Sequence, residues 1–321
     1  MSSLVVHASE LTKQYGPNAG VFGLDLEIPT GQIIGLIGPS GSGKTVTVRL
    51  MTGVLNPDAG KVEVLGEDPR QFDRQTRARI GYMPQHTVLI PDLSLRQNLN
   101  FAASLYGMPL RRKDRIDEVT DFLELGEVID RKPNQASGGE KRRLMLASAM
   151  IHQPELVFLD EPTAGIDPVL RRKFWDRFED MRSDGRTLVV TTQYVGEAAH
   201  CDLVAVLSRG RVLLVDTPEG LRRRAYGGDL VDIHFVEQPD NGDLVALEQL
   251  TGGSTPTWLS PRRVRLVVDD AATTTARVTK WADDRGLELT KTEPYLPSFD
   301  DVFVELVTRY DEQNGNGARV A

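Results

Sequence analysis

The stretch Ile33-Ile34-Gly35-Leu36-Ile37-Gly38-Pro39-Ser40-Gly41-Ser42-Gly43-Lys44-Thr45 decides the fold of this chain. Residues 33–37 predict a short strand buried on both faces, as in a parallel sheet. The residues after them match the pattern G-x-x-x-x-G-K-[ST], and a helix is predicted over residues 44–51. Glycines allow backbone N–H groups to surround a phosphate, and the start of a helix adds partial positive charge. We therefore expect Lys44 to reach the β- and γ-phosphates of a nucleotide and Thr45 to offer its hydroxyl to Mg²⁺.

Two carboxylates follow a second strand of the same buried type. Residues 156–159 are wholly apolar and lead directly into Asp160 and Glu161. We expect Asp160 to hold Mg²⁺, directly or through water, and Glu161 to accept a proton from an attacking water molecule. The alternative is that Asp160 and Glu161 have no catalytic role and that their carboxylates accept hydrogen bonds from helix N-termini. Together with the phosphate loop, the pair predicts a P-loop ATPase or GTPase without choosing among families.

Strands and helices alternate through the first two thirds of the chain. Ser94 and Gln97 form a capping-box pattern that predicts the start of a helix, and Pro168 suits the first turn of another. These two helices are predicted to cover residues 94–106 and 168–182. Further strands are predicted at residues 4–6, 21–28 and 187–191. Alternation of this kind predicts an α/β fold with a mostly parallel sheet.

The pattern changes near residue 227, where we place the end of a first domain, residues 1–227. Beyond it, Val231, Ile233 and Phe235 alternate with polar residues, as do Val264, Leu266 and Val268. This predicts two half-exposed antiparallel strands. Helices are predicted at residues 271–285 and after Ser298, an N-cap with Asp301 three residues on. We therefore expect a small α+β domain over residues 228–310 and a disordered polar tail over residues 311–321.

Composition limits the partners and the compartment expected for the chain. The net charge of −8 speaks against a nucleic-acid partner. Cys201 is the single cysteine, which fits a reducing compartment. No apolar run is long enough to span a bilayer, so at a membrane another chain would have to supply the spanning segments.

Ala136-Ser137-Gly138-Gly139-Glu140 resembles the LSGGQ signature of ABC (ATP-binding cassette) ATPases, and other family motifs match in chain order. Tyr15 resembles the aromatic residue that stacks on adenine. Gln85 resembles the glutamine that binds Mg²⁺ and the catalytic water, and Asp167 stands in a stretch similar to the D-loop. The resemblance covers roughly residues 4–225.

This resemblance implies a P-loop ABC ATPase domain with a mostly parallel sheet, an antiparallel subdomain and a helical subdomain. Its cofactors would be ATP and Mg²⁺, with Thr45, Gln85 and Asp160 as metal ligands. Two subunits would meet head to tail, so that Ser137, Gly138, Gly139 and Asp167 serve the nucleotide of the opposite subunit. The alternative for residues 137–139 is a simple helix start.

Three positions depart from the family pattern, the first being Ala136, which stands where the signature usually begins with leucine. Gln193 stands where most members have a histidine that contacts the γ-phosphate, and glutamine can donate a hydrogen bond there but cannot carry positive charge. Either Gln193 keeps that hydrogen bond while Glu161 acts as the base, or hydrolysis is slow and the closed dimer is long-lived. Glu140 replaces the usual glutamine, and we expect it to point away from the phosphate.

The stretch Pro297-Ser298-Phe299-Asp300-Asp301-Val302-Phe303 resembles a motif of the daunorubicin-resistance type of exporter ATPase. The function implied is an ATP-hydrolysing subunit that powers export of a drug, lipid or polyketide. Its partners would be a second ATPase subunit and a separate integral membrane subunit, which would hold it at the cytoplasmic face of the membrane. A non-transport regulatory ABC ATPase and an importer subunit are the alternatives. The C-terminal domain would either serve dimer stabilisation and regulation or only cover an apolar edge of the ATPase domain.

Overall fold

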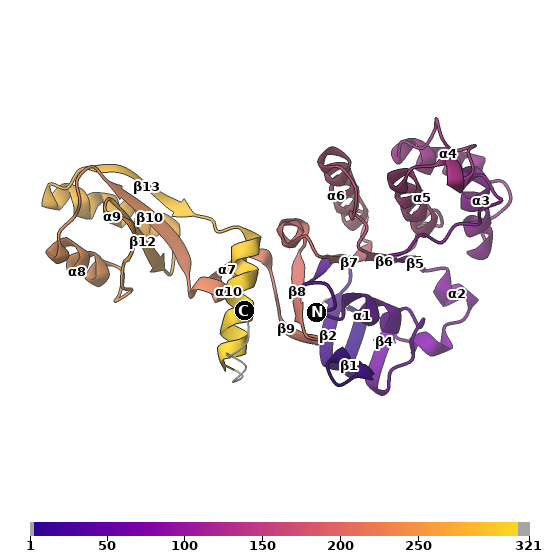
Figure 1. Ribbon diagram of the computed structural model, residues 1–321, viewed down its shortest axis with the longest axis horizontal. Helices are drawn as coiled ribbons and strands as arrows, with labels where there is room; N and C mark the ends of the chain where they lie inside the picture. The colour runs from indigo at the N-terminus through magenta and orange to yellow at the C-terminus, as the bar shows by residue number, and fades with distance from the viewer. Residues whose placement is uncertain (1–2, 314–321) are drawn as a thin grey trace. The chain divides into compact units, whose positions relative to one another are not determined.

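The computed structural model describes residues 3–313 and divides into two compact units, Met1–Val215 and Asp216–Ala321 (Figure 1). The division falls after Val215, earlier than the boundary expected near residue 227. Helix α7 (Pro218–Tyr226) lies in the second unit, where it packs against α10 (Phe299–Gln313). No helix among the described residues is both long and apolar enough to cross a bilayer.

A six-stranded sheet in the order β5-β6-β7-β3-β8-β9 forms the centre of the first unit. Its strands are β3 (Ile33–Ile37), β5 (Ile80–Met83), β6 (Leu156–Asp160), β7 (Thr187–Thr192), β8 (Leu203–Ser208) and β9 (Arg211–Asp216). The neighbouring strands from β5 to β8 all run parallel, which confirms the predicted mostly parallel sheet. Strands β3, β6 and β7 are buried at every residue, including the polar residues Asp160 at the end of β6 and Thr187, Thr191 and Thr192 in β7.

A second, antiparallel sheet in the order β2-β1-β4 belongs to the same unit. It consists of β1 (Leu4–Gly16), β2 (Ala19–Pro29) and β4 (Ala59–Val64). Helix α1 (Lys44–Met51) contacts β2 and β4 of this sheet and β6 of the parallel sheet. The helix therefore lies in the core between the two sheets, with Val48 and Met51 fully buried. This placement holds the phosphate loop, which precedes α1, in a rigid frame.

The remaining helices of the first unit include a cluster formed by α3, α4 and α5, in which α3 contacts both of the others. The predicted capping box at the start of α3 is confirmed, since Ser94 and Gln97 exchange both hydrogen bonds. The helices are α2 (Arg74–Arg77), α3 (Leu95–Leu105), α4 (Lys113–Phe122), α5 (Gly138–Met150) and α6 (Pro168–Ser183), with 3-10 turns at Pro69–Gln71, Pro133–Gln135 and Val195–His200.

The second unit contains more strands and helices than its sequence predicts. A four-stranded antiparallel sheet in the order β11-β12-β10-β13 replaces the two strands expected. Its strands are β10 (Asp229–Phe235), β11 (Thr257–Ser260), β12 (Arg263–Val268) and β13 (Leu289–Tyr295), and its further helices are α8 (Asn241–Leu250) and α9 (Ala271–Arg285). Strands β11 and β13 carry little alternation of apolar and polar residues because they form the two edges of the sheet.

One expectation for β10 is wrong in a specific way. Its polar position Asp232 is buried, at 1% exposure, although a half-exposed strand was expected. Arg265 and Arg263 on the neighbouring strand both donate to its carboxylate, with Arg265 Nε 2.7 Å from Oδ1. These bonds and charges lower the pKa of Asp232 against the burial that would raise it. A buried charge is tolerated here because two cations satisfy it.

The last helix begins as expected. The Ser298 hydroxyl accepts a hydrogen bond from the backbone N–H of Asp301 at 3.2 Å. Helix α10 continues through Gln313, so residues 311–313 of the segment expected to be disordered are helical. The rest of that segment, residues 314–321, lies outside the described residues.

Candidate nucleotide site

The loop between β3 and α1 surrounds a cavity of about 150 Å³. Gly43 has a φ of 102°, a conformation that favours glycine. A Cβ on Gly38 would lie 2.2 Å from the carbonyl oxygen of Leu207, so this position has no room for a side chain. The cavity is lined by Gly20, Ser40, Gly41, Ser42, Gly43, Lys44, Thr45, Val46, Gln85 and Glu161. Most residues of the predicted phosphate loop therefore meet around one space, together with the distant Gln85 and Glu161.

Lys44 bridges the two sides of this loop. Its ammonium group donates to the carbonyl oxygens of Gly38 at 2.6 Å and Pro39 at 3.0 Å. The side chain is buried, and burial lowers the pKa of Lys44, while the nearby carboxylates of Glu161 and Asp160 raise it. The cation is thus held at the cavity wall, where a phosphate oxygen could replace its carbonyl contacts.

Asp160 ends β6 beside Thr45. One carboxylate oxygen of Asp160, Oδ1, accepts from the hydroxyls of Thr191 at 2.6 Å and Thr45 at 3.1 Å. The other oxygen, Oδ2, is buried and has no hydrogen-bond partner among the described residues. A buried carboxylate oxygen without a partner is costly unless a ligand satisfies it. Carboxylate and hydroxyl oxygens are ligands that Mg²⁺ accepts, so this donor set fits the expected metal.

Glu161 is held in an unusual backbone conformation, with φ at 53°. Its N–H is fixed by Thr191, which accepts through both the hydroxyl, at 2.9 Å, and the carbonyl oxygen, at 3.1 Å. Its carboxylate accepts a hydrogen bond from Gln85 Nε2 at 3.1 Å. Strained backbone that the surroundings hold in place is typical of functional positions. The structure therefore brings Gln85, from the loop after β5, to Glu161 at the end of β6.

Arg142 on α5 is a residue of this site that motif matching missed. It is 9% exposed, and its guanidinium donates to the carbonyl oxygens of Gln85 at 2.6 Å and Asp160 at 3.1 Å. It also donates to the carbonyl oxygens of Glu161 and Pro162. Burial lowers the pKa of Arg142, opposed by the charges of Glu161 and Asp160. The sequence signal was only a basic run, Lys141-Arg142-Arg143, which is usually a solvated helix face.

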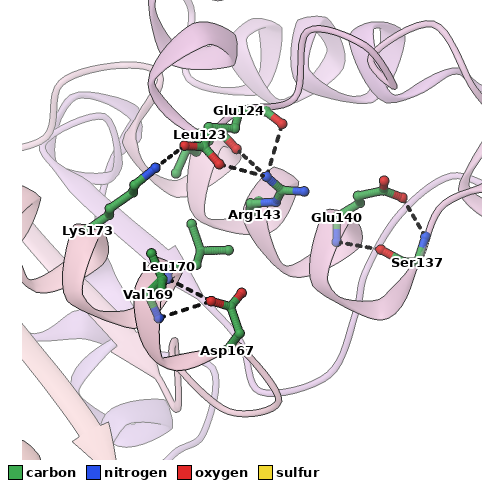
Figure 2. Close-up of polar contacts among 9 residues, drawn as sticks. All are labelled: Leu123, Glu124, Ser137, Glu140, Arg143, Asp167, Val169, Leu170 and Lys173. Atoms are coloured by element: carbon green, nitrogen blue, oxygen red, sulfur yellow. Dashed lines mark hydrogen bonds and ion pairs between the residues drawn. The ribbon is translucent and has the colours of Figure 1, made fainter.

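The segment that resembles the ABC signature lies at the start of α5 and does not line the cavity. The Ser137 hydroxyl accepts from the N–H of Glu140 at 3.2 Å, and the Glu140 carboxylate accepts from the N–H of Ser137 at 2.6 Å (Figure 2). The Glu140 carboxylate is therefore turned back onto its own helix start, and its bond to Ser137 N–H lowers the pKa of Glu140. Ser137 and Gly138 are exposed, so this helix N-terminus is open to an outside partner.

Six other predicted site residues also lie outside the cavity lining: Gly38, Pro39, Asp160, Asp167, Gln193 and Tyr15. Asp167 is the N-cap of α6 and accepts from the N–H groups of Val169 and Leu170, both at 3.0 Å (Figure 2). Gln193 follows β7 and is exposed. Tyr15, near the end of β1, is 58% exposed. An exposed aromatic ring is what stacking on a base requires.

Comparison with known proteins agrees with this geometry. The family model described as ABC transporter matches residues 21–164. The chain is 35% identical over 308 residues to the daunorubicin resistance ATP-binding protein DrrA3 of Streptomyces coeruleorubidus, covering 95% of this chain and 96% of the relative. It is 33% identical over 313 residues to the Nod factor export ATP-binding protein I of Paraburkholderia xenovorans (strain LB400), covering 96% and 99% of the two chains.

A solved structure shares the fold of the first part of the chain. It is a dimeric ATP-binding cassette in a post-hydrolysis state with ADP and Pi, at 25% identity and a TM-score of 0.61. The match covers 66% of this chain and 98% of that one. The chain belongs to the ABC transporter ATP-binding proteins, and it is an ATPase of that class.

Proposed function

We propose that this chain powers a membrane exporter by binding and hydrolysing ATP. The observation that carries the proposal is the cavity lined by Lys44, Thr45, Gln85 and Glu161, in which Thr45 donates to Asp160 and Gln85 donates to Glu161. The relatives named for daunorubicin resistance and for Nod factor export support the direction of transport. A drug, lipid or polyketide would be the cargo.

In this proposal the residues from Gly38 to Thr45 bind the phosphates through backbone N–H groups, and Lys44 binds the β- and γ-phosphates. Tyr15 stacks on the adenine. The hydroxyl of Thr45, the free oxygen of Asp160 and the side chain of Gln85 would hold Mg²⁺. Bound there, the ion would neutralise charge that develops on the phosphate oxygens.

Glu161 would serve as the general base. Its carboxylate lines the cavity and already accepts a hydrogen bond from Gln85, so a water molecule placed between them could give up its proton. Gln193 would donate its amide N–H toward the γ-phosphate from the end of β7. A neutral donor stabilises developing negative charge less than a cation does, which suits a slow turnover.

A second copy of the chain would complete the site. Ser137, Gly138 and Gly139 are at an exposed helix N-terminus that does not line the cavity of their own subunit. Such a helix start binds anions, so it would take the γ-phosphate held by the opposite subunit. Asp167, also exposed, would reach the same interface.

An exposed apolar surface of the first unit would receive the membrane partner. Val88 is 74% exposed and Ile90 36%, in the loop that follows Gln85. Phe101 and Leu105 on α3 add exposed apolar side chains, at 47% and 64%. The buried Asn98 holds the loop, since it accepts from the N–H of Ile90 at 2.7 Å and donates to its carbonyl oxygen at 3.1 Å. We propose that this surface binds the integral membrane subunit at the cytoplasmic side of the membrane.

The test is phosphate release by the purified chain beside its Glu161→Gln variant, with size-exclusion chromatography in ATP and Mg²⁺. The variant keeps the shape and the partner Gln85 but cannot take a proton. We expect its rate to fall by about 100-fold or more, and ATP to hold it as a dimer. Equal rates for the two proteins would remove Glu161 as the base, and a variant that stays monomeric in ATP would contradict the shared site.

A further inference from the structure

The second unit contains a cavity that the ATPase function does not use. Its volume is about 360 Å³, within the range of sites for small organic ligands. It lies between α7, the start of α9 and the connections at the ends of β10 and β13, all within the second unit. The wall is mainly apolar and includes Leu230, Ala271, Pro294, Tyr295, Leu296 and Pro297.

One cation in this cavity lacks a carboxylate partner. Arg222 on α7 lines the cavity, and none of the ion pairs among residues 3–313 includes it. Its Nε is buried and makes no hydrogen bond to a described residue. Its guanidinium carbon lies 3.9 Å from the centre of the Phe299 ring, which fixes the group in place. Burial lowers the pKa of Arg222, and the charge of Glu219 one turn earlier offsets this only in part.

The neighbouring arginines are engaged differently. Arg223 Nε lies 3.7 Å from Asp229 Oδ1, and its Nη2 donates to the carbonyl oxygen of Asp269 at 2.9 Å. Arg224 pairs with Asp216 and does not line the cavity. A guanidinium that is partly desolvated and unpaired is unfavourable, and an anionic ligand would relieve that cost. Arg222 is therefore the group around which a ligand would be oriented.

We propose that this cavity binds a free amphipathic organic anion, with an apolar or aromatic body and one carboxylate, sulfonate or phosphate group. The anionic group would meet Arg222, and the body would lie against the apolar wall near Tyr226 and Tyr295. Leu296, 71% exposed at the cavity, would cover the outer side of the ligand. This gives the second unit a ligand-sensing role that does not depend on the proposed direction of transport.

The proposal can be tested with two fluorescent probes that differ only in charge. The probe 8-anilinonaphthalene-1-sulfonate carries a sulfonate, and N-phenyl-1-naphthylamine lacks it. Both are titrated into the full-length chain with Mg²⁺ and excess ATP, which keeps the nucleotide site filled. We expect the sulfonate probe to bind more tightly than the neutral one, by about tenfold, as for a hydrogen bond to a charged group.

Matched variants locate the binding. Arg222→Met replaces the guanidinium over Phe299 with an uncharged, unbranched side chain and should remove the preference for the sulfonate probe, while Arg222→Lys should retain part of it. Arg224→Met removes a charge from the same helix outside the cavity and should change nothing. Leu296→Glu places a negative charge at an exposed position of the cavity and should weaken binding of the sulfonate probe. This variant tests the proposal independently if Arg222→Met folds poorly.

Several results would overturn the proposal. They are unchanged sulfonate-probe affinity in both Arg222→Met and Leu296→Glu, equal affinity of the two probes for the parent chain, or sulfonate-probe binding that is seen only when ATP is left out. In a final experiment, the chain is mixed with phosphatidylglycerol vesicles and its co-sedimentation with them is measured. Sedimentation that depends on Arg222 would assign the cavity to a membrane lipid instead of a free ligand.

Discussion

Replacing Arg142 with methionine should separate the positioning of the catalytic groups from nucleotide binding. The guanidinium of Arg142 donates to the carbonyl oxygens of Gln85, Asp160, Glu161 and Pro162. These carbonyls belong to the loop after β5 and to the end of β6. The backbone pairing of the two strands ends at Met83 and Leu159, so it does not fix the loop to the residues after β6. Arg142 is therefore the clamp that sets the distance between the Gln85 and Glu161 side chains.

The expected magnitude follows from the hydrogen bonds that methionine cannot make. Each buried carbonyl left without its donor costs on the order of 1 kcal/mol, and some of these oxygens will find water, so we expect a decrease of about 3 kcal/mol in unfolding free energy. The catalytic cost is separate, because displacing reacting groups by about 1 Å can lower a rate roughly 100-fold. We expect kcat to fall by about 10- to 100-fold with little change in ATP affinity.

The assay compares steady-state phosphate release with the affinity for a fluorescent ATP analogue, after urea unfolding has shown that each variant is folded. Arg115→Met is the matched control, because Arg115 also donates to backbone carbonyls, those of Met150 at 3.1 Å and Ile151 at 3.0 Å. Those carbonyls are at the other end of α5, away from the cavity. Arg142→Lys should recover part of kcat. If Arg142→Met and Arg115→Met lose stability alike and keep equal kcat values, the clamp has no role in positioning.

Three further predictions concern other parts of the first unit. Gln193→His should raise ATP turnover several-fold if the neutral side chain limits hydrolysis, and an unchanged rate would show that Gln193 is an adequate donor. Burial lowers the pKa of His152 from 6.5 to about 4, so the unfolded chain binds more protons in this range, and up to roughly 3 kcal/mol of stability should be lost as pH falls from about 6.5 toward 4. His152→Phe keeps the stack on Tyr106, whose ring centre is 3.5 Å away, and should flatten this part of the pH profile measured by urea midpoints. Ile90→Asp should abolish coupling to the membrane subunit while ATP binding is retained, and transport that survives the change would exclude this loop from the contact.

Much of the first unit could be read from local sequence because its elements carry strong local signals. The apolar runs of β3 and β6, the phosphate loop and the capping box at Ser94 each depend on residues close together in the chain. The second unit could be read less well. Strands β11 and β13 lie at sheet edges, where exposure removes the alternation that marks a strand, so only two of the four strands were predicted.

The sequence by itself determined which residue types serve the nucleotide, since glycines, a lysine, a hydroxyl and strand-end carboxylates are required by phosphate and metal chemistry at any such loop. Only the tertiary structure decided how they meet. Gln85 reaches Glu161, and Arg142 reaches both, because parallel pairing places the ends of β5 and β6 side by side and packs α5 against both strands. Sequence patterns report exposure and backbone preference over a few neighbouring residues. Contacts between residues far apart in the chain are decided when the core closes around them.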